Sequence, residues 1–314
     1  MRILITGATG FIGQHLLEDL KKSEISLRIL TRQKDPVFWS NPVLEKVNGD
    51  ISNSEEVNLA MRGVDVLIHM AAELKNMDKF ESSNITGVEN IAKAAKKAGV
   101  KKVIHLSSVG VVGMQHSITP VWIDENALSQ PKNGYERSKL GAEVILKAEL
   151  ENSPVSLVIL RPTNVFGEKH PKFYLLNLLQ YIQSGKPILT KKDSVLNYLY
   201  VKDLTQTILH FALESQSEGT FNVGHMQSLR HFMLVCGDIL NTKPRLIEVP
   251  VLLFNIAEKA KYLGSSKIQA QLQSLSNSVI YSDEKLAKQL NYKYGVEEGL
   301  RRTVEYYKDK KFLS

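Results

Sequence analysis

Residues 1–13 read MRILITGATGFIG, an apolar run that leads directly into a glycine-rich turn. The run at residues 3–5 is typical of a buried strand, and apolar residues at helical spacing follow the turn, so a strand, a tight turn and a helix are predicted. Such a turn requires glycine at three places: Gly7 for backbone angles that a Cβ resists, Gly10 for close approach to a phosphate, and Gly13 for packing of the helix on the sheet. The amides that begin the helix would face a pyrophosphate, so the stretch predicts a dinucleotide site. We expect the same site to include the neighbouring residues Thr9, Phe11 and Ile12.

The composition is that of an ordinary globular protein. The chain has 314 residues, of which 43% are hydrophobic, so it can bury a large core as one big domain or two smaller ones. Its one cysteine, Cys236, excludes an internal disulfide, suits a reducing compartment and is expected to be a small buried residue without thiol chemistry. The first apolar run ends at Thr6-Gly7, too early for a signal peptide, and no apolar run is long enough to span a bilayer. We therefore expect a cytoplasmic protein with no membrane contact.

The net charge of +7 does not by itself indicate a nucleic-acid partner. The lysines fall in scattered pairs, such as Lys21-Lys22 and Lys310-Lys311, which is typical of a solvated surface. A modest positive charge also attracts a phosphate-bearing cofactor and an anionic substrate. We therefore expect small-molecule ligands and no nucleic acid.

The first half of the chain alternates strand-like and helix-like segments. This rhythm predicts a parallel sheet covered by helices on both faces, that is, an α/β fold with a Rossmann-type doubly wound parallel sheet. The expected strands are 2–6, 27–31, 44–48, 64–69, 102–107 and 156–160. The expected helices in this half are 54–61, 79–98 and 135–150.

Beyond Arg161-Pro162 the alternation becomes irregular. We predict that residues 1–165 form the dinucleotide-binding Rossmann domain and that residues 166–314 form mainly a smaller C-terminal substrate-binding lobe, with some segments returning to the Rossmann sheet. The apolar segment 249–263 matches an ordinary amphipathic packing helix better than a membrane-surface helix. The expected helices of this part are 172–183, 203–213, 229–240 and 251–263.

Two residues four positions apart, Tyr135 and Lys139, are expected on the same face of a helix. A tyrosine hydroxyl has an ordinary pKa of about 10 and is a poor base at neutral pH. A neighbouring ammonium and a cationic nicotinamide ring both favour its phenolate form, which can exchange a proton with an alcohol or carbonyl oxygen. The pair alone is common in helices, so it indicates an active site only together with other features.

Two further polar positions are expected near this pair. Ser107 and Ser108 stand at the end of a predicted strand, so at least one hydroxyl should emerge at the carboxyl edge of the sheet, where open parallel sheets bind their ligands. Asn84 lies early in the helix that is expected to flank that strand.

With these residues the chain resembles the extended branch of the short-chain dehydrogenase/reductase family, the NAD-dependent epimerase/dehydratase family, which contains epimerases, dehydratases and reductases. The resemblance runs nearly end to end and rests on an ordered series of motifs. Besides TGATGFIG and Tyr135-x-x-x-Lys139, these are Gly49-Asp50-Ile51, His69-Met70-Ala71-Ala72, Arg161-Pro162-Thr163-Asn164-Val165-Phe166-Gly167, Tyr200-Val201-Lys202-Asp203, Phe221-Asn222-Val223-Gly224 and the closing stretch 282–307.

The resemblance implies catalytic roles for three residues. Ser108 would hydrogen-bond the reacting oxygen, Tyr135 would transfer the proton, and Lys139 would lower the pKa of Tyr135 and bind the nicotinamide ribose. Ser108 is preferred to Ser107 because it stands three residues before Val111-Val112-Gly113, the counterpart of the family's Val-Tyr-Gly.

Other positions are implied to support the reaction or the cofactor. Asn84 would be a structural or proton-relay residue, and Asp50 and Ile51 would lie near the adenine. The remaining cofactor-lining positions are Ala71, Ala72, Pro162, Asn164 and Val165. No metal site is implied, and a homodimer is expected through helices 79–98 and 135–150, as in many relatives.

The end of the second strand favours NADP over NAD. A carboxylate at this place binds the adenosine ribose of NAD and repels the 2′-phosphate of NADP. This chain has Leu30-Thr31-Arg32-Gln33-Lys34 there, with Arg28 nearby, and Arg32 suits a 2′-phosphate. NADP is therefore the preferred cofactor, and NAD stays possible.

Departures from the family pattern narrow the reaction. Val109-Gly110 follow Ser108 where dehydratases of this branch have acidic residues and where fucose-type epimerase/reductases have a cysteine. Dehydration and C3/C5 epimerisation are therefore disfavoured. The arginine that many sugar-nucleotide enzymes place before Tyr-Val-x-Asp falls at Leu196, which leaves other cations to supply a charge for a diphosphate. The candidates are Lys191, Lys192 and Lys172.

Four functions stay open on this basis. Net reduction of a 4-keto sugar nucleotide is preferred, because an exchangeable NADP(H) suits one-way ketone reduction. The alternatives are a sugar-nucleotide 4-epimerase, a reductase for an apolar, steroid- or flavonoid-like ketone, and a non-catalytic dinucleotide sensor. A sensor is disfavoured because such proteins commonly lose the Tyr-Lys pair, which this chain keeps.

Overall fold

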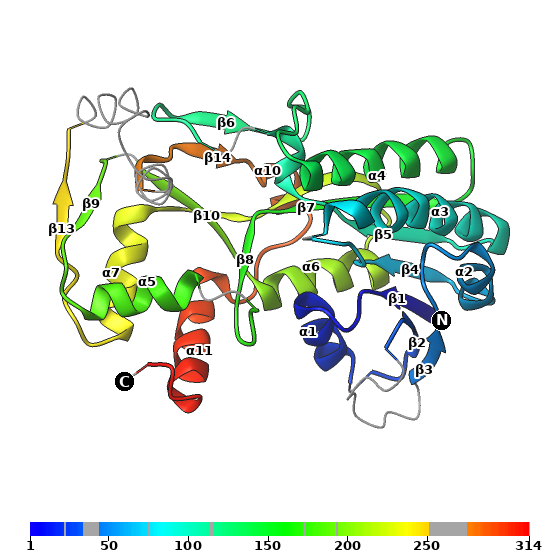
Figure 1. Cartoon of the computed structure of the whole chain (residues 1–314), viewed down its shortest axis with the longest axis horizontal. Helices are drawn as coiled ribbons and strands as arrows, with labels where there is room; N and C mark the ends of the chain where they lie inside the picture. The colour runs from blue at the N-terminus through cyan, green and yellow to red at the C-terminus, as the bar shows by residue number, and fades with distance from the viewer. Residues whose placement is uncertain are drawn as a thin grey trace.

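The computed structural model describes residues 1–21, 23–33, 44–74, 76–113, 116–171, 174–192, 194–250 and 275–313 (Figure 1). Its largest sheet has seven parallel strands in the order β11-β7-β5-β4-β1-β2-β3. They are β1 (Arg2–Thr6), β2 (Ser26–Thr31), β3 (Leu44–Asn48), β4 (Val66–His69), β5 (Lys102–Leu106), β7 (Ser156–Pro162) and β11 (Gly219–Val223). Since the chain starts near the middle of the sheet and winds outward in both directions, this order confirms the predicted Rossmann-type doubly wound fold.

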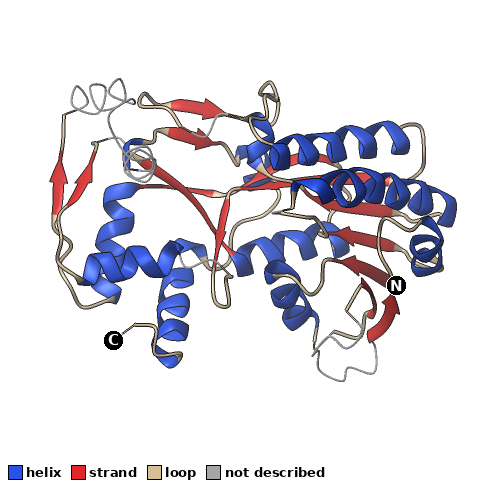
Figure 2. Ribbon diagram, in the orientation of Figure 1, coloured by secondary structure: helices blue, strands red, loops and turns tan. Residues whose placement is uncertain are grey.

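Alternation within β1 explains why helices cover both faces of the sheet. Ile3 and Ile5 belong to one hydrophobic core and Leu4 to the other, and all three are fully buried. Successive residues of a strand point to opposite faces, so an apolar run requires cover on both sides. One core is covered by α1 (Phe11–Leu20) and α6 (Val201–Leu213), and the other by α2 (Ser54–Met61), α3 (Gly87–Ala98) and α4 (Gly134–Leu150). Figure 2 shows the strands between these two layers of helices.

The C-terminal part builds a second, smaller core, at the left of Figure 1. Its three-stranded sheet has the order β12-β10-β8, and three helices pack around it. These elements are β8 (Asn164–Phe166), β10 (Val195–Tyr200), β12 (His225–Ser228), α5 (Tyr174–Gln183), α7 (Leu229–Ile239) and α11 (Gly295–Asp309). The other described elements are the parallel pairs β9 (Ile188–Thr190) with β13 (Leu246–Glu248) and β6 (Val121–Ile123) with β14 (Val279–Tyr281), and the short helix α10 (Glu284–Ala287).

Most expected helices and strands are found within two residues of their predicted ends. The exception is the helix expected at 79–98, which divides into a 3₁₀ turn η1 (Met77–Lys79), a π-helix η2 (Phe80–Thr86) and α3. The wider π turn, a feature often found at functional sites, holds Asn84 in a buried position, 2% exposed. Strand β11 joins the edge of the large sheet from the C-terminal part. The helix expected at 251–263 lies outside the described residues.

Three further properties of the described residues concern a reactive thiol, a membrane-spanning helix and a metal site. Cys236 in α7 is buried, and this burial raises the pKa of its thiol to about 12. Within the described ranges, no helix is both long and apolar enough to cross a membrane, and no group of three or more metal-ligating side chains is found.

Candidate active site

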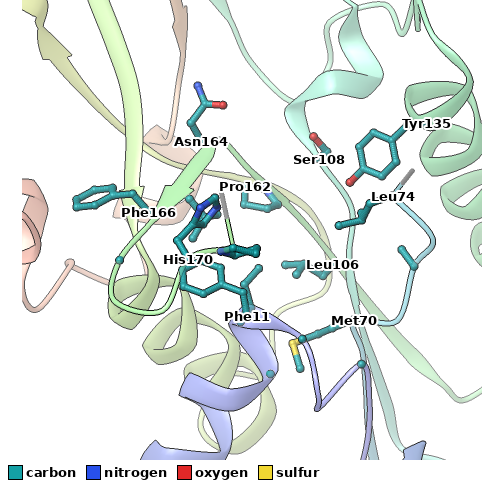
Figure 3. Close-up of a pocket in the computed structure, with 18 of the residues that line it drawn as sticks. Phe11, Met70, Leu74, Leu106, Ser108, Tyr135, Pro162, Asn164, Phe166 and His170 are labelled. Carbon is teal, nitrogen blue, oxygen red and sulfur yellow. The ribbon is translucent and has the colours of Figure 1, made fainter. Parts of the chain in front are cut away.

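A cavity of about 1560 Å³ lies along the carboxyl ends of β1, β2, β4, β5 and β7 and continues between β8, α5 and β10. Typical small-molecule pockets have roughly 300–1000 Å³, so this cavity has room for a dinucleotide and a second ligand. Figure 3 shows part of its lining, with Phe11 of α1 and Met70, which follows β4, in the lower part and Ser108 and Tyr135 at the upper right.

The turn between β1 and α1 lines the cavity as a backbone cradle. Gly7 has a φ of 75°, and a Cβ there would lie 2.6 Å from the amide nitrogen of Ala71, so glycine is required. A Cβ at Gly13 would lie 2.3 Å from the carbonyl oxygen of Gly7, so this glycine lets α1 pack against the turn itself, not against the sheet as predicted. Gly10 is the N-cap of α1 and no side chain caps the helix, which leaves its first amides to a ligand. This geometry fits a pyrophosphate. The predicted residues that line the cavity here are Gly7, Thr9, Gly10, Phe11, Ile12 and Gly13.

Arg32 and Asp50 lie together in the part of the cavity where the adenosine is expected. Arg32 Nη1 lies 3.5 Å from Asp50 Oδ2, and both residues line the cavity with Ile51. Burial opposes ionisation of Asp50, but hydrogen bonds from Ser52 and the charge of Arg32 outweigh it and keep the pKa of Asp50 below its ordinary value. The positive charge of Arg32 is therefore shared with a carboxylate that follows β3.

Arg28, expected near this end, has a different role. Its guanidinium donates hydrogen bonds of 2.7 Å to the carbonyl oxygens of Ala60 and Arg62 at the C-terminus of α2, and it pairs with Glu45 at 2.8 Å. The Arg28 side chain is buried between β2 and the end of α2, where it caps this helix instead of facing a cofactor. Lys34 lies outside the described residues.

The end of β5 places two serines on the cavity, but their hydroxyls differ. Ser107 is 3% exposed, and its hydroxyl donates to Glu143 Oε1 at 2.5 Å. The oxygen of Ser108 accepts a hydrogen bond from the amide of Gly110 at 3.0 Å, which leaves its single proton for a ligand. The structure therefore supports the choice of Ser108 over Ser107.

Tyr135 and Lys139 come from the first two turns of α4. The side chain of Asn133 caps this helix by accepting from the amide of Glu136 at 2.9 Å. Lys139 is 4% exposed, and its Nζ donates to the carbonyl oxygen of Leu106 at 2.6 Å. Both Tyr135 and Lys139 line the cavity, and Figure 3 shows the side chains of Tyr135 and Ser108 in the same part of it.

Burial changes the protonation of both side chains. Burial and the charge of Glu136 raise the pKa of Tyr135 to about 12. Burial lowers the pKa of Lys139 to about 8, although the charge of Glu143 acts in the opposite direction. In the protein by itself the pKa of Tyr135 is therefore raised and not lowered as predicted, because desolvation of the phenolate and the charge of Glu136 act in the same direction. Tyr135 is therefore protonated at neutral pH, where most of Lys139 is charged.

Asn84 does not line the cavity. Its Oδ1 accepts from the amide of Glu73 at 2.7 Å, and its Nδ2 donates to the carbonyl oxygen of Glu73 at 3.0 Å and to Ser138 Oγ at 2.9 Å. It therefore ties the segment after β4 to α4, which favours the structural alternative of its two predicted roles. The other predicted cofactor residues that line the cavity are Ala71, Ala72, Pro162, Asn164 and Val165.

One wall of the cavity was missed by sequence reasoning. Its residues have aromatic or aliphatic side chains and come from β8, α5, β10 and the loop between β8 and α5. They include Phe166, His170, Tyr174, Leu178, Tyr181 and Tyr198. Two of them are open to solvent, with exposures of 67% for Tyr174 and 40% for Tyr181, and His170 makes an edge contact with Phe11 at 4.7 Å between ring centroids. The apolar spacing at 172–183 predicts a helix, but it does not tell whether the apolar face meets the core or a cavity.

Two of the three cations considered for a diphosphate, Lys191 and Lys192, are not part of this wall. Lys191 is 3% exposed and Lys192 is exposed, and neither lines the cavity. Lys172 lies outside the described residues. Leu196 is half-buried and packs against the C-terminal core.

Comparison with known proteins agrees with this geometry. The model of the NAD dependent epimerase/dehydratase family matches residues 3–224. A trifunctional UDP-glucose 4,6-dehydratase/UDP-4-keto-6-deoxy-D-glucose 3,5-epimerase/UDP-4-keto-L-rhamnose-reductase (RHM3) of Arabidopsis thaliana is 27% identical over 335 aligned residues, which cover 97% of this chain and 47% of that protein. The N-acetyl-alpha-D-glucosaminyl-diphospho-ditrans,octacis-undecaprenol 4-epimerase of Escherichia coli O157:H7 is 33% identical over 190 residues, or 59% of this chain and 54% of that protein. The alignments thus span about half the length of these two curated relatives.

The fold is also found among solved structures. The Bordetella bronchiseptica enzyme WbmG, crystallised in complex with NAD, superposes with a TM-score of 0.75 at 22% sequence identity, covering 100% of this chain and 96% of that one.

Proposed function

Because the chain belongs to the NAD-dependent epimerase/dehydratase family, we propose that it is an oxidoreductase that transfers a hydride between a nicotinamide dinucleotide and a secondary alcohol or ketone, with reduction of a 4-keto sugar nucleotide as the preferred reaction. One observation carries this proposal. The glycine cradle after β1 lines the same cavity as Ser108, Tyr135 and Lys139. A cradle alone would serve a sensor, whereas a proton-transfer group beside it serves chemistry.

The side chains suggest how the reaction would run. A bound dinucleotide supplies or accepts the hydride. The Ser108 hydroxyl donates a hydrogen bond to the reacting oxygen, and the Tyr135 hydroxyl gives that oxygen a proton during reduction or removes it during oxidation. The Lys139 ammonium stabilises the phenolate that reduction leaves behind. With its pKa raised to about 12, the Tyr135 phenol is protonated at neutral pH and can begin a reduction as the proton donor.

A sugar-nucleotide 4-epimerase is the second candidate. The relative from Escherichia coli O157:H7 is named as a 4-epimerase of a sugar joined to undecaprenol through a diphosphate, which supports 4-epimerisation but not the nucleotide carrier. Such a reaction would use the same three side chains in both directions. The two candidates differ in stoichiometry, because a reductase consumes one reduced dinucleotide per product and an epimerase consumes none.

Within this function we propose NADP as the preferred cofactor. The Arg32 side chain is 63% exposed at the adenosine end, and no carboxylate ends β2. NAD is the alternative, because Asp50 shares the charge of Arg32 and WbmG was crystallised with NAD. Fluorescence titration should give a dissociation constant for NADPH at least roughly tenfold below that for NADH, about 1.4 kcal/mol, and Arg32→Ala should remove the difference. Equal constants in the native protein would rule out the preference for NADP.

The wall of aromatic residues bears on the part of the substrate beyond the sugar. We propose that residues 166–314 contribute most of the substrate-facing surface and residues 1–165 most of the dinucleotide-facing surface. The described residues that line the cavity include one lysine, Lys139, and one arginine, Arg32, and neither of these lies on the aromatic wall. Tyr174 and Tyr198 suit stacking on a base or contact with an apolar chain. The carrier of the sugar would therefore be held here mainly by stacking and van der Waals contact.

A substrate panel tests the proposal. The protein is incubated with each dinucleotide and with UDP- and dTDP-linked 4-keto sugars, UDP-sugars, polyprenyl-diphosphate sugars or apolar ketones, while the absorbance of the reduced nicotinamide is recorded. Oxidation of NADPH by a 4-keto sugar nucleotide supports the preferred reaction. Isomerisation of a UDP-sugar without net change in absorbance supports the 4-epimerase. Turnover of apolar ketones alone, or dinucleotide binding without any turnover, contradicts both.

A further inference from the structure

A buried carboxylate lies one helical turn beyond Lys139. Tyr135, Lys139 and Glu143 are spaced four residues apart on α4, so their side chains share one face of the helix. Lys139 is 4% exposed and Glu143 is 1% exposed. Glu143 and its partner Arg161 are not part of the cavity lining, so neither is placed to touch a ligand.

The carboxylate of Glu143 accepts three hydrogen bonds. Its Oε1 accepts from Ser107 Oγ at 2.5 Å and from Arg161 Nε at 2.9 Å, and its Oε2 accepts from Arg161 Nη2 at 2.6 Å. The remaining guanidinium nitrogen, Nη1, donates to the carbonyl oxygen of Glu125 at 3.3 Å. Buried ion pairs of this kind rarely stabilise a fold more than apolar residues of similar size would. Their presence here therefore calls for a role beyond folding.

The same carboxylate fixes the end of β5. Ser107, which donates to Glu143, lies between Leu106, whose carbonyl oxygen receives the Lys139 ammonium at 2.6 Å, and Ser108. The amide of Ser107 donates to the carbonyl oxygen of Leu160 at 2.7 Å, which binds this strand end to β7 beside Arg161. A displacement of Glu143 would therefore move the backbone that carries both Ser108 and the acceptor for Lys139.

Glu143 also sets the charge balance around Lys139. The titratable groups near the ammonium are Tyr135 and Glu143 on α4, His105 on β5 and His69 on β4, with Arg161 of β7 behind Glu143. Both histidines are fully buried and neutral, because burial and the charge of Lys139 lower the pKa of each, that of His69 to about 3. Glu143 is thus the negative charge that offsets the burial of Lys139.

From this arrangement we infer that Glu143 is a positioning residue: held by Arg161 and Ser107, it keeps the Lys139 ammonium protonated within the core and aligns the end of β5 with Tyr135. The inference deepens the proposed function and rests on it for the use made of Lys139. Its test requires no substrate and no cofactor.

The charge of Lys139 can be followed directly by NMR in protein carrying isotope-labelled lysine, with the Lys139→Met variant used to assign the Nζ signal. Glu143→Gln keeps the size of the side chain and an acceptor for Arg161 but loses the negative charge. We expect the titration midpoint of Lys139 to fall by about one pKa unit or more in this variant. Glu149→Gln, the same change on the same helix, is the matched control and should leave the midpoint where it is.

The direction of the shift separates this role from a purely structural one. Loosened packing admits water and would raise the midpoint toward the ordinary lysine value of about 10.5. A rise or no change in Glu143→Gln therefore overturns the inference. If this variant does not fold, the double variant Glu143→Gln/Arg161→Met removes both charges of the ion pair. Because the charge of Glu143, and not that of Arg161, acts on Lys139, the Lys139 midpoint should still fall in the double variant, and a rise or no change there overturns the inference. A protein that shows the fall but turns over nothing in the substrate panel would contradict the proposed function and leave the role of Glu143 intact.

Discussion

Ser107 and Ser108 are adjacent in the chain and both line the cavity, yet their hydroxyl groups have different hydrogen-bond partners. The Ser107 hydroxyl donates its proton to Glu143 on α4, whereas the Ser108 oxygen accepts from the amide of Gly110 and keeps its proton for another acceptor. The side chains of α4 differ in the same way: Tyr135 lines the cavity, whereas Glu143 is buried in the core and does not line it. The residues of this site thus form two groups: side chains that line the cavity, and side chains behind them that hold the lining residues in position.

Tyr135→Phe removes the proton donor without changing the shape of the cavity. We expect turnover of the substrate identified in the panel to fall by roughly 10²–10⁴-fold, because general acid catalysis is lost, while the NADPH dissociation constant stays within a factor of two. Steady-state kinetics and fluorescence titration of the same preparation measure the two quantities. Native-like turnover would show that another group transfers the proton.

Two glycines of the cradle are expected to be needed for different reasons, Gly13 for the packing of α1 and Gly10 for the binding of the dinucleotide. A Cβ at Gly13 would lie 2.3 Å from the carbonyl oxygen of Gly7, so Gly13→Ala should lower stability by about 1–3 kcal/mol and with it the thermal unfolding midpoint. A Cβ at Gly10 would meet only the carbonyl oxygen of Gly7 at 3.3 Å, so Gly10→Ala should unfold near the native temperature but bind NADPH more weakly. Equal effects of the two variants on stability and binding would contradict this separation.

At the scale of elements, the π-helix η2 and the helix α4 together hold the segment after β4. Asn84, on η2, bonds both backbone groups of Glu73 and the hydroxyl of Ser138 on α4. The sequence predicts a regular α-helix from 79 to 98, because the only glycine in this stretch, Gly87, stands where the π-helix passes into α3 and does not by itself indicate a π turn. The turn depends on partners that lie 11 and 54 residues away in sequence.

Asn84→Ala leaves the backbone groups of Glu73 without their buried partner. Each lost hydrogen bond to a buried group costs about 1–3 kcal/mol, so the segment should open more often and the Glu73 amide should exchange its hydrogen faster. Hydrogen exchange measured by NMR or mass spectrometry reports this directly. Asn84→Asp, which keeps the acceptor for the Glu73 amide, should protect it better than alanine does. Unchanged exchange with lost turnover would instead indicate a proton relay.

The strands of the large sheet could be predicted from the sequence because short apolar runs bounded by glycine or polar residues have few other interpretations. The wall formed by α5 could not, because the same apolar spacing serves a helix that faces the core and one that faces a cavity. The orientation of the Arg28 side chain could not be predicted from the sequence either. It depends on the pairing of β2 with β3 and on the end of α2, and neither is visible in the local sequence.

At the scale of the whole molecule, two histidines in the middle of the sheet make stability depend on pH. His69 and His105 are buried side by side with ring centroids 5.3 Å apart, and neither ring nitrogen of His105 has a hydrogen-bond partner within the described structure. Burial lowers the pKa of both in the folded state, whereas unfolding returns them to about 6.5. The folded state binds fewer protons below that value, so this stability is present above pH 6.5 and is lost as the pH falls.

His105→Leu removes one of these groups. We expect the variant to be at least as stable as the native protein at pH 7, because a buried polar ring without partners is replaced by an apolar side chain. Its thermal midpoint should fall less between pH 7 and pH 5 than that of the native protein, because the variant takes up about one proton fewer on unfolding. His231→Leu, at an exposed position, should keep the native pH dependence. An identical acid loss in all three proteins would contradict this account.

The fold as a whole followed from two local features, the glycine turn after the first strand and the regular alternation in the first half. The candidate site followed from motifs that place serine, tyrosine and lysine at neighbouring strand and helix ends. The protonation states did not follow, because the pKa of Tyr135 and that of Lys139 are set by burial beneath segments distant in sequence.

The link between the two sheets is short. Strand β7 ends at Pro162 and β8 begins at Asn164, and between them the amide of Thr163 donates to the carbonyl oxygen of Val223 at 2.9 Å. All three linking residues line the cavity, on the side expected for the nicotinamide. If a ligand on the aromatic wall moves β8, we expect it also to move the adjoining residues of the dinucleotide surface, which would link the two binding equilibria. Dinucleotide and substrate then each change the other's affinity by the same factor, whichever of them binds first.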